Sequence, residues 1–493
     1  MNQIIHSTGP REGVRGRRRR LGMIQISPSL PRLSVIGLGK LGSPMAACFA
    51  AHGFQVAGAD IDPAKVEAIN QGRAPVCETD LQRYLDLSRG RITATRDTAE
   101  AVDWSDVSFL IVPTPSDPEG GFSLRSALPA CESVGLALRR KTDFHVVVMT
   151  STVMPGSTDG PIRATLEEVS GKVCGRDFGL CYSPEFIALG SVIHNFLNPD
   201  MILIGESDTR SGDILEAIYR RTCDNQPHFA RMSCVNAELT KLAVNTYITT
   251  KITFANLISR LCEKLPGGNV DVVTAALGAD SRIGAKYLKG ATGYGGPCFP
   301  RDNRALAFLA RQAGTRALIA EATDRMNQEE IHRLTALVKS HVPRGGTVGI
   351  LGLAYKPDTD VVEESQGLFL AHNLSWSGYP VVAYDPLAME NAARVLSQWP
   401  RPLESAAIRF AASAQECVAG ADLVVIATPW KAFHNLQPGD FARGSATRKV
   451  VIDCWRLLNP AAFTRVAEYH ALGLGPSPIP SIQAMQPEQE RVS

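Results

Sequence analysis

Residues 32–62 read RLSVIGLGKLGSPMAACFAAHGFQVAGADID, and this stretch decides the fold. An apolar run, a glycine turn, an amphipathic stretch and a second apolar run follow one another, which predicts a strand, a helix and a second strand. The turn carries Gly37, Gly39 and Gly42 in the spacing GxGxxG. Glycines at these places permit a tight turn, a close approach of a pyrophosphate to backbone N–H groups, and packing of the helix on the strand.

Asp60 ends the second predicted strand, eighteen residues after Gly42. A carboxylate at this distance accepts a hydrogen bond from a ribose 2′-hydroxyl, which predicts NAD rather than NADP as the cofactor. The glycine spacing alone is a weak signal, and a glycine turn that arose by chance is the alternative. The flanking strand, helix and acid make the nucleotide interpretation specific.

Two more apolar segments, VSFLIVPTP at 107–115 and HVVVMTST at 145–152, continue this half of the chain. Each ends in turn residues, at the edge where a doubly wound sheet binds its ligands. We therefore expect Thr114 and Thr152 to face the cofactor, with capping of the next element as the alternative for both.

A second alternation of strands and helices begins with GTVGILGLAYKPDTD at 346–360. Three further apolar segments follow it, namely VVAYDP at 381–386, DLVVIATP at 422–429 and KVVIDC at 449–454. This pattern predicts a second Rossmann-like half. Its first turn, GILGLA from Gly349 to Ala354, matches the first fingerprint with the last glycine replaced.

Between the two halves, residues 236–262 contain little glycine or proline and are predicted to form one long helix. Lys241 and Asn245 are four residues apart on it, so their side chains share one face, although such a pair also arises by chance. We predict an α/β fold, with two Rossmann-like doubly wound domains joined by a central helical domain. The boundaries that we predict are a disordered basic tail at 1–30, a nucleotide-binding domain at 31–230, the helical domain at 231–327, a second Rossmann-like domain at 328–475 and a disordered tail at 476–493.

The segment GYGGPCFPRD at 293–302 places Cys298 between glycines and Pro300. Pro300 predicts the first turn of a helix, with Cys298 at its positive end, where a thiolate is favoured. The pattern indicates a nucleophile, and the alternative is a buried cysteine that packs as a small apolar residue.

The bulk composition excludes several classes of protein. A chain of 493 residues predicts two to four domains, and no stretch approaches the roughly 18 continuous apolar residues of a membrane helix. Eleven cysteines without a CxxC pair predict reduced thiols in a cytoplasm, with no disulfide framework and no metal site.

The distribution of charge argues against a nucleic-acid-binding surface on the body of the protein. The net charge is +2, and the first 22 residues carry +5, so the remaining body carries −3. The basic tail is a candidate for binding a polyanion or for targeting. A start codon assigned too early and a disordered arm are the alternatives.

Several motifs occur together in the order found in one enzyme family. Beside GxGxxG with Asp60, they are STVMPGS at 151–157, YSPEF at 182–186, ELTKLAVN at 238–245, GYGGPCFPRD at 293–302 and GLAYK at 352–356. With them, residues 32–470 resemble the UDP-glucose/GDP-mannose dehydrogenase family. The resemblance implies an N-terminal NAD domain, a central dimerisation domain and a C-terminal domain that holds the nucleotide sugar.

The resemblance implies oxidation of a sugar C6 alcohol to a carboxylate with two NAD molecules in turn. Cys298 would add to the aldehyde as a thiohemiacetal and then hold a thioester, because an aldehyde must become tetrahedral before it can lose hydride. Glu185 would assist hydrolysis of the thioester.

Four further residues receive catalytic roles from the same resemblance. Lys241 and Asn245 would stabilise the developing oxyanion, Asp302 would support proton transfer, and Thr152 would position a water molecule. The lysine would also lower the pKa of the thiol.

The resemblance also implies two binding sets and no metal. The cofactor set is Gly37, Gly39, Gly42, Asp60, Lys65, Thr114, Thr152 and Arg301, the last standing where a lysine is usual. The substrate set is Glu185, Lys241, Asn245, Arg282, Tyr287, Lys289, Gly295 and Lys356. Arg282 resembles a residue that reaches the sugar site of a neighbouring subunit, which implies a homodimer or a higher oligomer.

Within the family, the Cys-Phe-Pro sequence and Arg282-Ile-Gly284 favour UDP-glucose, with UDP-glucuronate as product. UDP-N-acetylhexosamine and GDP-mannose are the alternative substrates. A 3-hydroxyacid or 6-phosphogluconate-type dehydrogenase and an inactive nucleotide-sugar sensor are the alternative functions. Two departures affect the expected contacts between domains and cofactor: Glu363 stands where the family has an arginine, and Arg456 is displaced by one position.

Overall fold

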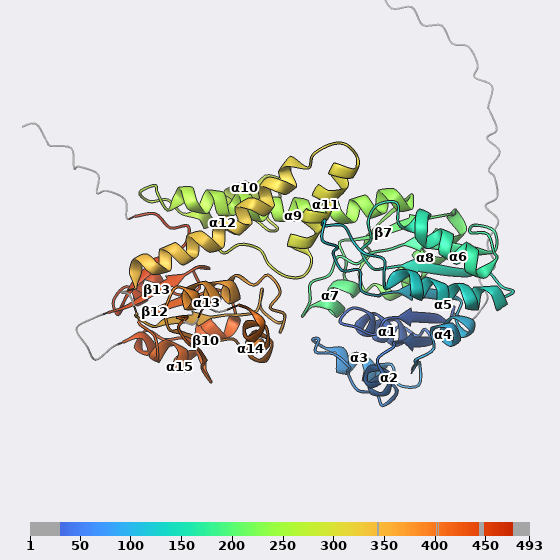
Figure 1. Ribbon diagram of the computed structural model, residues 1–493, viewed down its shortest axis with the longest axis horizontal. Coiled ribbons are helices and arrows are strands. Elements are labelled where there is room, and N and C mark those ends of the chain that lie inside the picture. The colour runs from blue at the N-terminus through green and yellow to red at the C-terminus, as the bar shows by residue number, and fades with distance from the viewer. Residues whose placement is uncertain (1–29, 343–344, 401, 403, 443–447, 477–493) are drawn as a thin grey trace, which may run out of the picture.

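The computed structural model describes residues 30–342, 345–400, 402, 404–442 and 448–476. Two β-sheets lie at opposite ends of the molecule, and a layer of long helices joins them (Figure 1). The predicted α/β fold, with two Rossmann-like domains and a central helical region, is confirmed. The tails predicted at 1–30 and 476–493 lie outside the described residues, apart from residues 30 and 476.

The first sheet has eight strands in the order β3-β2-β1-β4-β5-β6-β7-β8. Neighbouring strands are parallel except β6 and β7. In chain order the strands are β1 Leu33–Ile36, β2 Val56–Ala59, β3 Ile92–Thr95, β4 Val107–Leu110, β5 His145–Met149, β6 Phe178–Tyr182, β7 Met201–Glu206 and β8 His228–Met232. Its helices are α1 Gly42–Ala51, α2 Pro63–Asn70, α3 Leu81–Leu87, α4 Thr98–Trp104, α5 Ala127–Arg140, η1 Thr158–Ile162, α6 Arg163–Ser170, α7 Val192–Leu197 and α8 Thr209–Thr222.

Both faces of this sheet are buried, as its continuous apolar strands require. Successive side chains of a strand point to opposite faces. Val35 therefore packs in one buried cluster with Phe49 of α1, whereas Ile36 packs in another with Val134 of α5. Helices cover the sheet on both sides (Figure 1), and sheets of this kind bind ligands at the carboxyl ends of their strands, here those of β1, β4 and β5.

The central layer consists of α9 Cys234–Cys262, α10 Val270–Ala279, α11 Phe299–Gln312 and α12 Leu318–His341. The predicted long helix is confirmed and begins at Cys234, two residues before the expected start. The far end of α12 continues into the core of the second sheet through Ile331, Leu334 and Val338. One unbroken helix thus passes the predicted domain boundary at residue 328.

The second sheet has six parallel strands in the order β11-β10-β9-β12-β13-β14. They are β9 Val348–Leu351, β10 Val381–Tyr384, β11 Ile408–Phe410, β12 Leu423–Ile426, β13 Lys449–Asp453 and β14 Ala467–Ala471. The helices around it are α13 Gln366–Trp376, α14 Met389–Gln398, α15 Ala414–Ala419, η2 Lys431–Asn435, η3 Pro438–Phe441 and α16 Pro460–Phe463. The order of the first five strands repeats that of β1 to β5, which confirms a second Rossmann-like half.

The glycine turn of this second half differs from the one that we predict. Gly352, with φ +104°, is the counterpart of Gly37, with φ +101°, whereas Gly349 lies inside β9. A Cβ on Gly367 would lie 2.1 Å from the carbonyl oxygen of Gly352, so Gly367 is the glycine that lets the helix pack. The assignment of Gly349 as the first glycine of the turn is wrong, because the close approach comes from a residue outside the contiguous motif.

Each turn is followed by an aspartate at the end of the next strand. Asp60 accepts from the backbone N–H of Leu38 at 2.7 Å. Its counterpart, Asp385, accepts from the N–H of Leu353 at 2.8 Å and also from the indole Nε1 of Trp430 at 3.1 Å.

Every helix within the described residues is too short or too polar to cross a lipid bilayer.

Candidate active site

Cys298 immediately precedes α11 and its N-terminal Pro300, as predicted. Its carbonyl oxygen accepts from the N–H of Asp302 at 2.8 Å, which closes the first helical turn. The residue is exposed, a property shared among the eleven cysteines only by Cys77. It therefore does not fit the alternative of a fully buried structural cysteine, although protein atoms surround the sulfur.

The surroundings of the Cys298 sulfur do not favour the thiolate on balance. Protein atoms that displace water, together with the carboxylate of Asp302, raise the pKa of the thiol. The charges of Arg301 and Lys241 oppose this change without cancelling it. Lys241 acts in the predicted direction, but the expectation of a favoured thiolate is wrong because desolvation outweighs the cations.

Lys241 and Asn245 are both buried and share the face of α9 that meets Cys298 and α11. Lys241 Nζ donates to the carbonyl oxygen of Glu185 at 2.6 Å and lies 4.4 Å from the centre of the Phe186 ring. Asn245 Nδ2 donates to Asp302 Oδ2 at 2.6 Å. The pair therefore joins the loop after β6 to the first turn of α11.

Burial also changes the protonation of the lysine. Desolvation lowers the pKa of Lys241, and the nearby Asp302, Cys298 and Glu185 oppose that change. A primary ammonium in this position can donate to an oxyanion and releases its proton more readily than a solvated lysine.

Glu185 follows β6 and accepts a hydrogen bond from the phenol of Tyr219 at 3.0 Å. Tyr219 in turn accepts from the hydroxyl of Ser183 at 3.2 Å. Burial raises the pKa of Glu185 to about 7, against the hydrogen bond from Tyr219 and the charge of Lys241. A carboxyl that titrates near neutrality is suited to general base catalysis.

Arg301 connects the cysteine segment to the edge of the first sheet. Its guanidinium lies 4.4 Å from the centre of the Phe122 ring, and Nη1 donates to the carbonyl oxygen of Thr114 at 3.4 Å. Its Nε donates to the fully buried Asp302 at 3.3 Å. The structure thus brings Arg301 to the carboxyl end of β4, where the cofactor is expected.

The first glycine turn fits a dinucleotide. A Cβ on Gly37 would lie 2.1 Å from the carbonyl oxygen of Ile111, and one on Gly42 would lie 1.8 Å from that of Gly37. A Cβ on Gly39 would meet nothing within 4 Å, so this glycine faces open space. In dinucleotide-binding turns two glycines allow close packing of the backbone and one allows the pyrophosphate to approach. Gly37 and Gly42 match the first role, and Gly39 matches the second.

The carboxylate that follows this turn is fixed by its neighbours. Asp60 lies at the end of β2 and accepts from the N–H of Asp62 at 2.9 Å. Lys65 Nζ lies 3.3 Å from its other oxygen. The predicted cofactor residues Asp60 and Lys65 therefore lie together.

Thr114 and Thr152 also meet, at the ends of β4 and β5. Thr114 Oγ1 donates to the carbonyl oxygen of Thr152 at 2.7 Å. The hydroxyl of Thr114 thus bridges two strand ends rather than capping the next helix. Their contact with a cofactor stays a prediction.

The glycine-rich segment before Cys298 lies against the second domain. Gly296 N–H donates to the carbonyl oxygen of Glu363 at 2.9 Å, and a Cβ on Gly295 would lie 2.4 Å from the carbonyl oxygen of Glu364. A Cβ on Gly296 would lie 2.6 Å from the ring of Tyr355. Glycine at these two positions allows the cysteine segment to approach the second domain this closely.

The other predicted substrate residues fall into two groups. Tyr287, with φ +66°, packs its ring 6.5 Å from that of Phe299, beside the cysteine. Lys356 is half-buried, and burial lowers its pKa. Arg282 and Lys289 are exposed and pair with carboxylates of the central helical region, namely Asp280 at 2.6 Å and Asp271 at 3.7 Å.

The structure also shows the contacts of Glu363 and Arg456, the two residues that depart from the family pattern. The Glu363 side chain is exposed, while its carbonyl holds Gly296. Arg456, with φ +56°, binds Asp271 with two hydrogen bonds of 2.7 and 3.0 Å and donates to the carbonyl oxygen of Leu472. Its guanidinium therefore links the second domain to α10.

Sequence reasoning missed Tyr219 and Tyr355 at this site. Tyr355 is part of the GLAYK motif, so the motif could have indicated that it lies at the site. Tyr219 lies within α8 without any motif, and only the fold brings it to Glu185.

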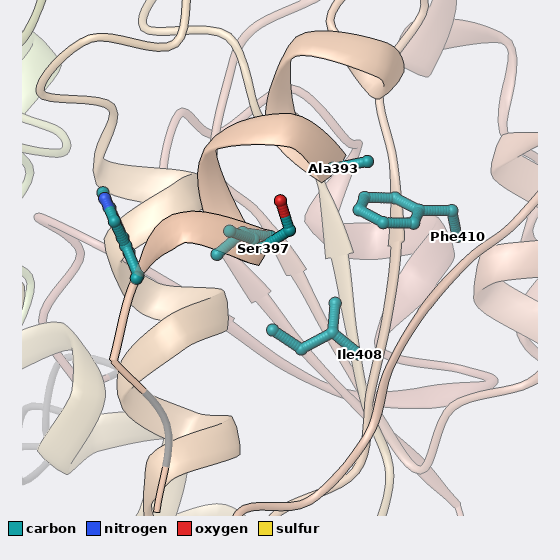
Figure 2. Close-up of a pocket in the computed structure, with 6 residues that line it drawn as sticks. Ala393, Ser397, Ile408 and Phe410 are labelled. Carbon is teal, nitrogen blue, oxygen red and sulfur yellow. The ribbon is translucent and has the colours of Figure 1, made fainter.

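A separate surface hollow lies between α14 and β11 of the second domain (Figure 2). It is lined by Ala393, Leu396, Ser397, Trp399, Ile408 and Phe410. This lining contains no thiol, carboxylate or lysine, so it does not offer the groups gathered around Cys298.

The sequence matches three consecutive models of one family. They are described as UDP-glucose/GDP-mannose dehydrogenase family, NAD binding domain, at residues 31–223, central domain at 235–329 and UDP binding domain at 349–460. Among solved structures, a UDP-glucose dehydrogenase from the hyperthermophilic archaeon Pyrobaculum islandicum is 34% identical with a TM-score of 0.81, over 92% of this chain and 100% of that one.

Curated relatives show the same relationship with more than one substrate named. The UDP-glucose 6-dehydrogenase AglM of Haloferax volcanii is 35% identical over 430 residues, which cover 86% of this chain and 97% of that protein. The GDP-mannose 6-dehydrogenase of Pseudomonas putida is 33% identical over 442 residues, which cover 88% and 98% respectively. The match extends through all three parts of the fold, and the chain belongs to the UDP-glucose/GDP-mannose dehydrogenase family of NAD-dependent nucleotide-sugar dehydrogenases.

Proposed function

We propose that this chain oxidises C6 of UDP-glucose to the carboxylate of UDP-glucuronate through a thioester on Cys298. The observation that supports this proposal most directly is the gathering of one exposed thiol with a buried lysine, amide and carboxylate, namely Cys298, Lys241, Asn245 and Asp302. Gly39 of the first glycine turn, with Asp60 and Lys65, would hold NAD, which would supply the hydride acceptor for both oxidation steps.

The binding roles follow from the positions of the side chains. Asp60 and Lys65 hold the ribose end of the cofactor, Gly39 admits its pyrophosphate, and Thr114 with Arg301 borders the reacting end. Lys356, Tyr287 and Gly295 hold the nucleotide sugar between the cysteine segment and the second domain.

In the first step the sugar alcohol loses hydride from C6 and a proton from its oxygen. A water molecule positioned by Thr152 carries this proton toward Asp302, while Lys241 and Asn245 donate to the oxygen as negative charge develops. The product of this step is the aldehyde.

In the second step the Cys298 sulfur adds to the aldehyde carbon, and its proton passes to the carbonyl oxygen through the same donors. Loss of hydride from this thiohemiacetal, with loss of the hydroxyl proton, gives the thioester. The raised pKa of the thiol means that attack requires proton removal at the moment of addition, for which the buried lysine and aspartate are adjacent.

Hydrolysis completes the reaction. Glu185, with its pKa of about 7, takes a proton from water, which attacks the thioester carbon. The carbon–sulfur bond breaks, the sulfur regains a proton, and the carboxylate leaves.

The choice of UDP-glucose rests on the Cys-Phe-Pro sequence of 298–300 and on relatives named UDP-glucose 6-dehydrogenase. GDP-mannose is the second candidate, because relatives named for it are nearly as similar. The second sheet and the matched UDP binding domain do not fit a 3-hydroxyacid or 6-phosphogluconate-type dehydrogenase.

The test is the yield of NADH with excess NAD and limiting UDP-glucose, GDP-mannose or UDP-N-acetylhexosamine in parallel. About two NADH per UDP-glucose supports the proposal, because each oxidation releases one hydride. About two NADH per molecule of another sugar would identify that sugar as the substrate and contradict the choice of UDP-glucose. One NADH contradicts the thioester route, and none with any sugar supports an inactive sensor.

We also propose that the chain forms a homodimer through α9 and α10. Large apolar side chains are exposed along both helices: Val235, Leu239, Tyr247, Phe254, Leu257, Leu261, Val272 and Val273. A row of exposed apolar side chains along neighbouring helices is typical of a surface that another protein covers, and a second copy of the same helices would cover it.

We further propose a cytoplasmic location and the domain boundaries at residues 31, 231 and 328. The eleven cysteines are all free thiols in the structure, which is consistent with a reducing compartment.

A further inference from the structure

The end of α12 and the last strand of the second sheet bring together three side chains that bind metals. His341 is the final residue of α12, while Glu468 and His470 are on β14. One ligand atom from each of the three lies within 4.8 Å of the other two. None of them belongs to the site around Cys298.

The backbone places the two β14 ligands on one face. Residues two apart on a strand point to the same side, so Glu468 and His470 are neighbours, and His470 Nε2 lies 2.8 Å from Glu468 Oε1. Both side chains are partly exposed, so an ion can reach the pair from solvent.

The ring of His341 is oriented through its Nδ1, which lies 2.9 Å from the carbonyl oxygen of Leu337 and 3.0 Å from the hydroxyl oxygen of Ser340. A carbonyl oxygen only accepts, so the contact with Leu337 favours the tautomer that carries the hydrogen on Nδ1. Nε2 is therefore the nitrogen with the lone pair. Metal-bound histidines are oriented by the same kind of hydrogen bond from the other ring nitrogen.

The two imidazoles are already close. The ring centres of His341 and His470 are 4.2 Å apart, at an interplanar angle of 61°. Ligands of a tetrahedral Zn²⁺ site lie about 3.4 Å from one another, given metal–ligand bonds near 2.1 Å. The ligand atoms of the three side chains lie within 4.8 Å of one another, so the side chains must rotate to reach this spacing, and the exposures of His470 (36%) and Glu468 (56%) leave them room to do so.

We propose that His341, Glu468 and His470 form a binding site for a divalent transition-metal ion such as Zn²⁺. Two imidazoles and one carboxylate suit such an ion, and the remaining position is filled by water.

The site would act on domain arrangement rather than on catalysis. It joins α12, which comes from the central layer, to the strand that leads back to that layer: Gly473, just after β14, donates to Glu263 at 2.9 Å and accepts from Val270 at 2.9 Å. An ion there cross-links the two chain segments that connect the second domain to the central helices.

The test uses the full chain carrying Cys77→Ser and Cys298→Ser, which removes the two exposed thiols that could also bind the ion. Calorimetric titration with ZnCl₂ of protein without an affinity tag should show one strong site per chain. His341→Ala, His470→Ala and Glu468→Gln should each weaken this site at least tenfold, and Zn²⁺ should raise the midpoint of thermal unfolding only while the site is intact.

His332→Ala is the matched control. His332 is exposed on the same helix as His341, on the opposite side of that helix. The variant should bind Zn²⁺ as the parent does. The proposal is overturned if the parent shows no such site, if His332→Ala weakens it equally, or if Glu468→Gln, whose exposed side chain leaves folding undisturbed, binds with unchanged affinity.

Discussion

Lys40 Nζ lies 2.8 Å from Asp360 Oδ1, so one ion pair joins the glycine turn of the first Rossmann-like domain to the second domain. Asn391 of α14 donates to the other oxygen of Asp360 at 3.1 Å and fixes the carboxylate. Nearby, a Cβ on Gly190 would lie 1.8 Å from the carbonyl oxygen of Asp358, so the two domains touch directly here. The cofactor turn is thus tied to the position of the sugar-binding half.

Lys40→Met and Asp360→Asn should each raise the KM for NAD about three- to fivefold, since a partly exposed ion pair contributes about 1 kcal/mol or less. Steady-state kinetics measures this, and the double variant should be no worse than either single variant because both remove the same pair. Lys431→Met, at an exposed position of the second domain, is the control. Additive effects in the double variant would show that the two residues act independently.

Gly39→Ala should impair NAD binding, whereas Gly42→Ala should impair the stability of the fold. Gly39 has open space where a Cβ would lie, so its variant should fold with an unchanged unfolding midpoint and lose NAD binding at least tenfold. Gly42→Ala places a Cβ 1.8 Å from the carbonyl of Gly37 and should lower the midpoint itself. Thermal unfolding with and without NAD distinguishes them, and equal loss of binding without loss of stability in both would contradict the assignment of roles.

The turnover of UDP-glucose should rise as pH increases through about 7, because Glu185 accepts a proton from water only when ionised. Glu185→Gln should lose that limb of the pH profile and about 100-fold or more in turnover. Glu132→Gln, an exposed carboxyl on α5, is the control. A profile unchanged in Glu185→Gln would assign the limb to another group.

The same carboxyl makes a prediction about stability. Its pKa is raised from 4.5 to about 7 in the folded chain, so the folded state holds the proton more tightly and loses stability as pH rises between these values. Glu185→Gln cannot ionise, and its unfolding midpoint should exceed that of the parent by more at pH 8 than at pH 4.5. An equal difference at both pH values would contradict the raised pKa.

Cys298→Ser should reduce turnover of UDP-glucose to NADH and UDP-glucuronate by at least 100-fold, because serine does not form the thioester. Cys77→Ser is the matched control, since it removes the other exposed thiol. Full two-NADH turnover by Cys298→Ser would disprove covalent catalysis at this position.

Tyr247→Lys and Leu257→Lys should convert the proposed dimer to a monomer, because each places a charge on the exposed apolar face of α9. Light scattering coupled to gel filtration gives the mass. Leu136→Lys, at an exposed apolar site on α5 whose exposure lies between those of Leu257 and Tyr247, should leave the mass unchanged. A parent chain that is already monomeric and active when dilute would contradict the proposed dimer.

The parts of the site that could be predicted from sequence are those encoded in short contiguous segments. Gly37, Gly42 and Asp60 form one βαβ unit, and Pro300 marks the helix behind Cys298, so local chemistry is enough to place them. The match to family motifs also predicted that Lys241 and Asn245 lie near Cys298, where the structure has them.

The parts that could not be predicted depend on contacts between distant segments. Gly367 replaces the expected third glycine of the second turn although it is fifteen residues beyond Gly352. The raised pKa of Cys298 arises from desolvation in the folded chain and from the nearby carboxylate of Asp302, and the opposing charge of Lys241 comes from a helix fifty-seven residues earlier in the sequence. His341 and His470 likewise meet only because α12 ends beside the edge of the second sheet.

The hydrogen bond from Trp430 to Asp385 distinguishes the corresponding aspartates of the two Rossmann-like halves. In the first half, Asp60 accepts from the backbone N–H groups of Leu38 and Asp62, and its side-chain partner is the partly exposed Lys65. In the second half, Asp385 is 1% exposed and accepts from the turn and from the buried indole of Trp430, which a ribose hydroxyl would have to displace. This difference favours the first half as the site of the redox nucleotide, in agreement with the NAD binding domain matched at residues 31–223 and the UDP binding domain matched at 349–460.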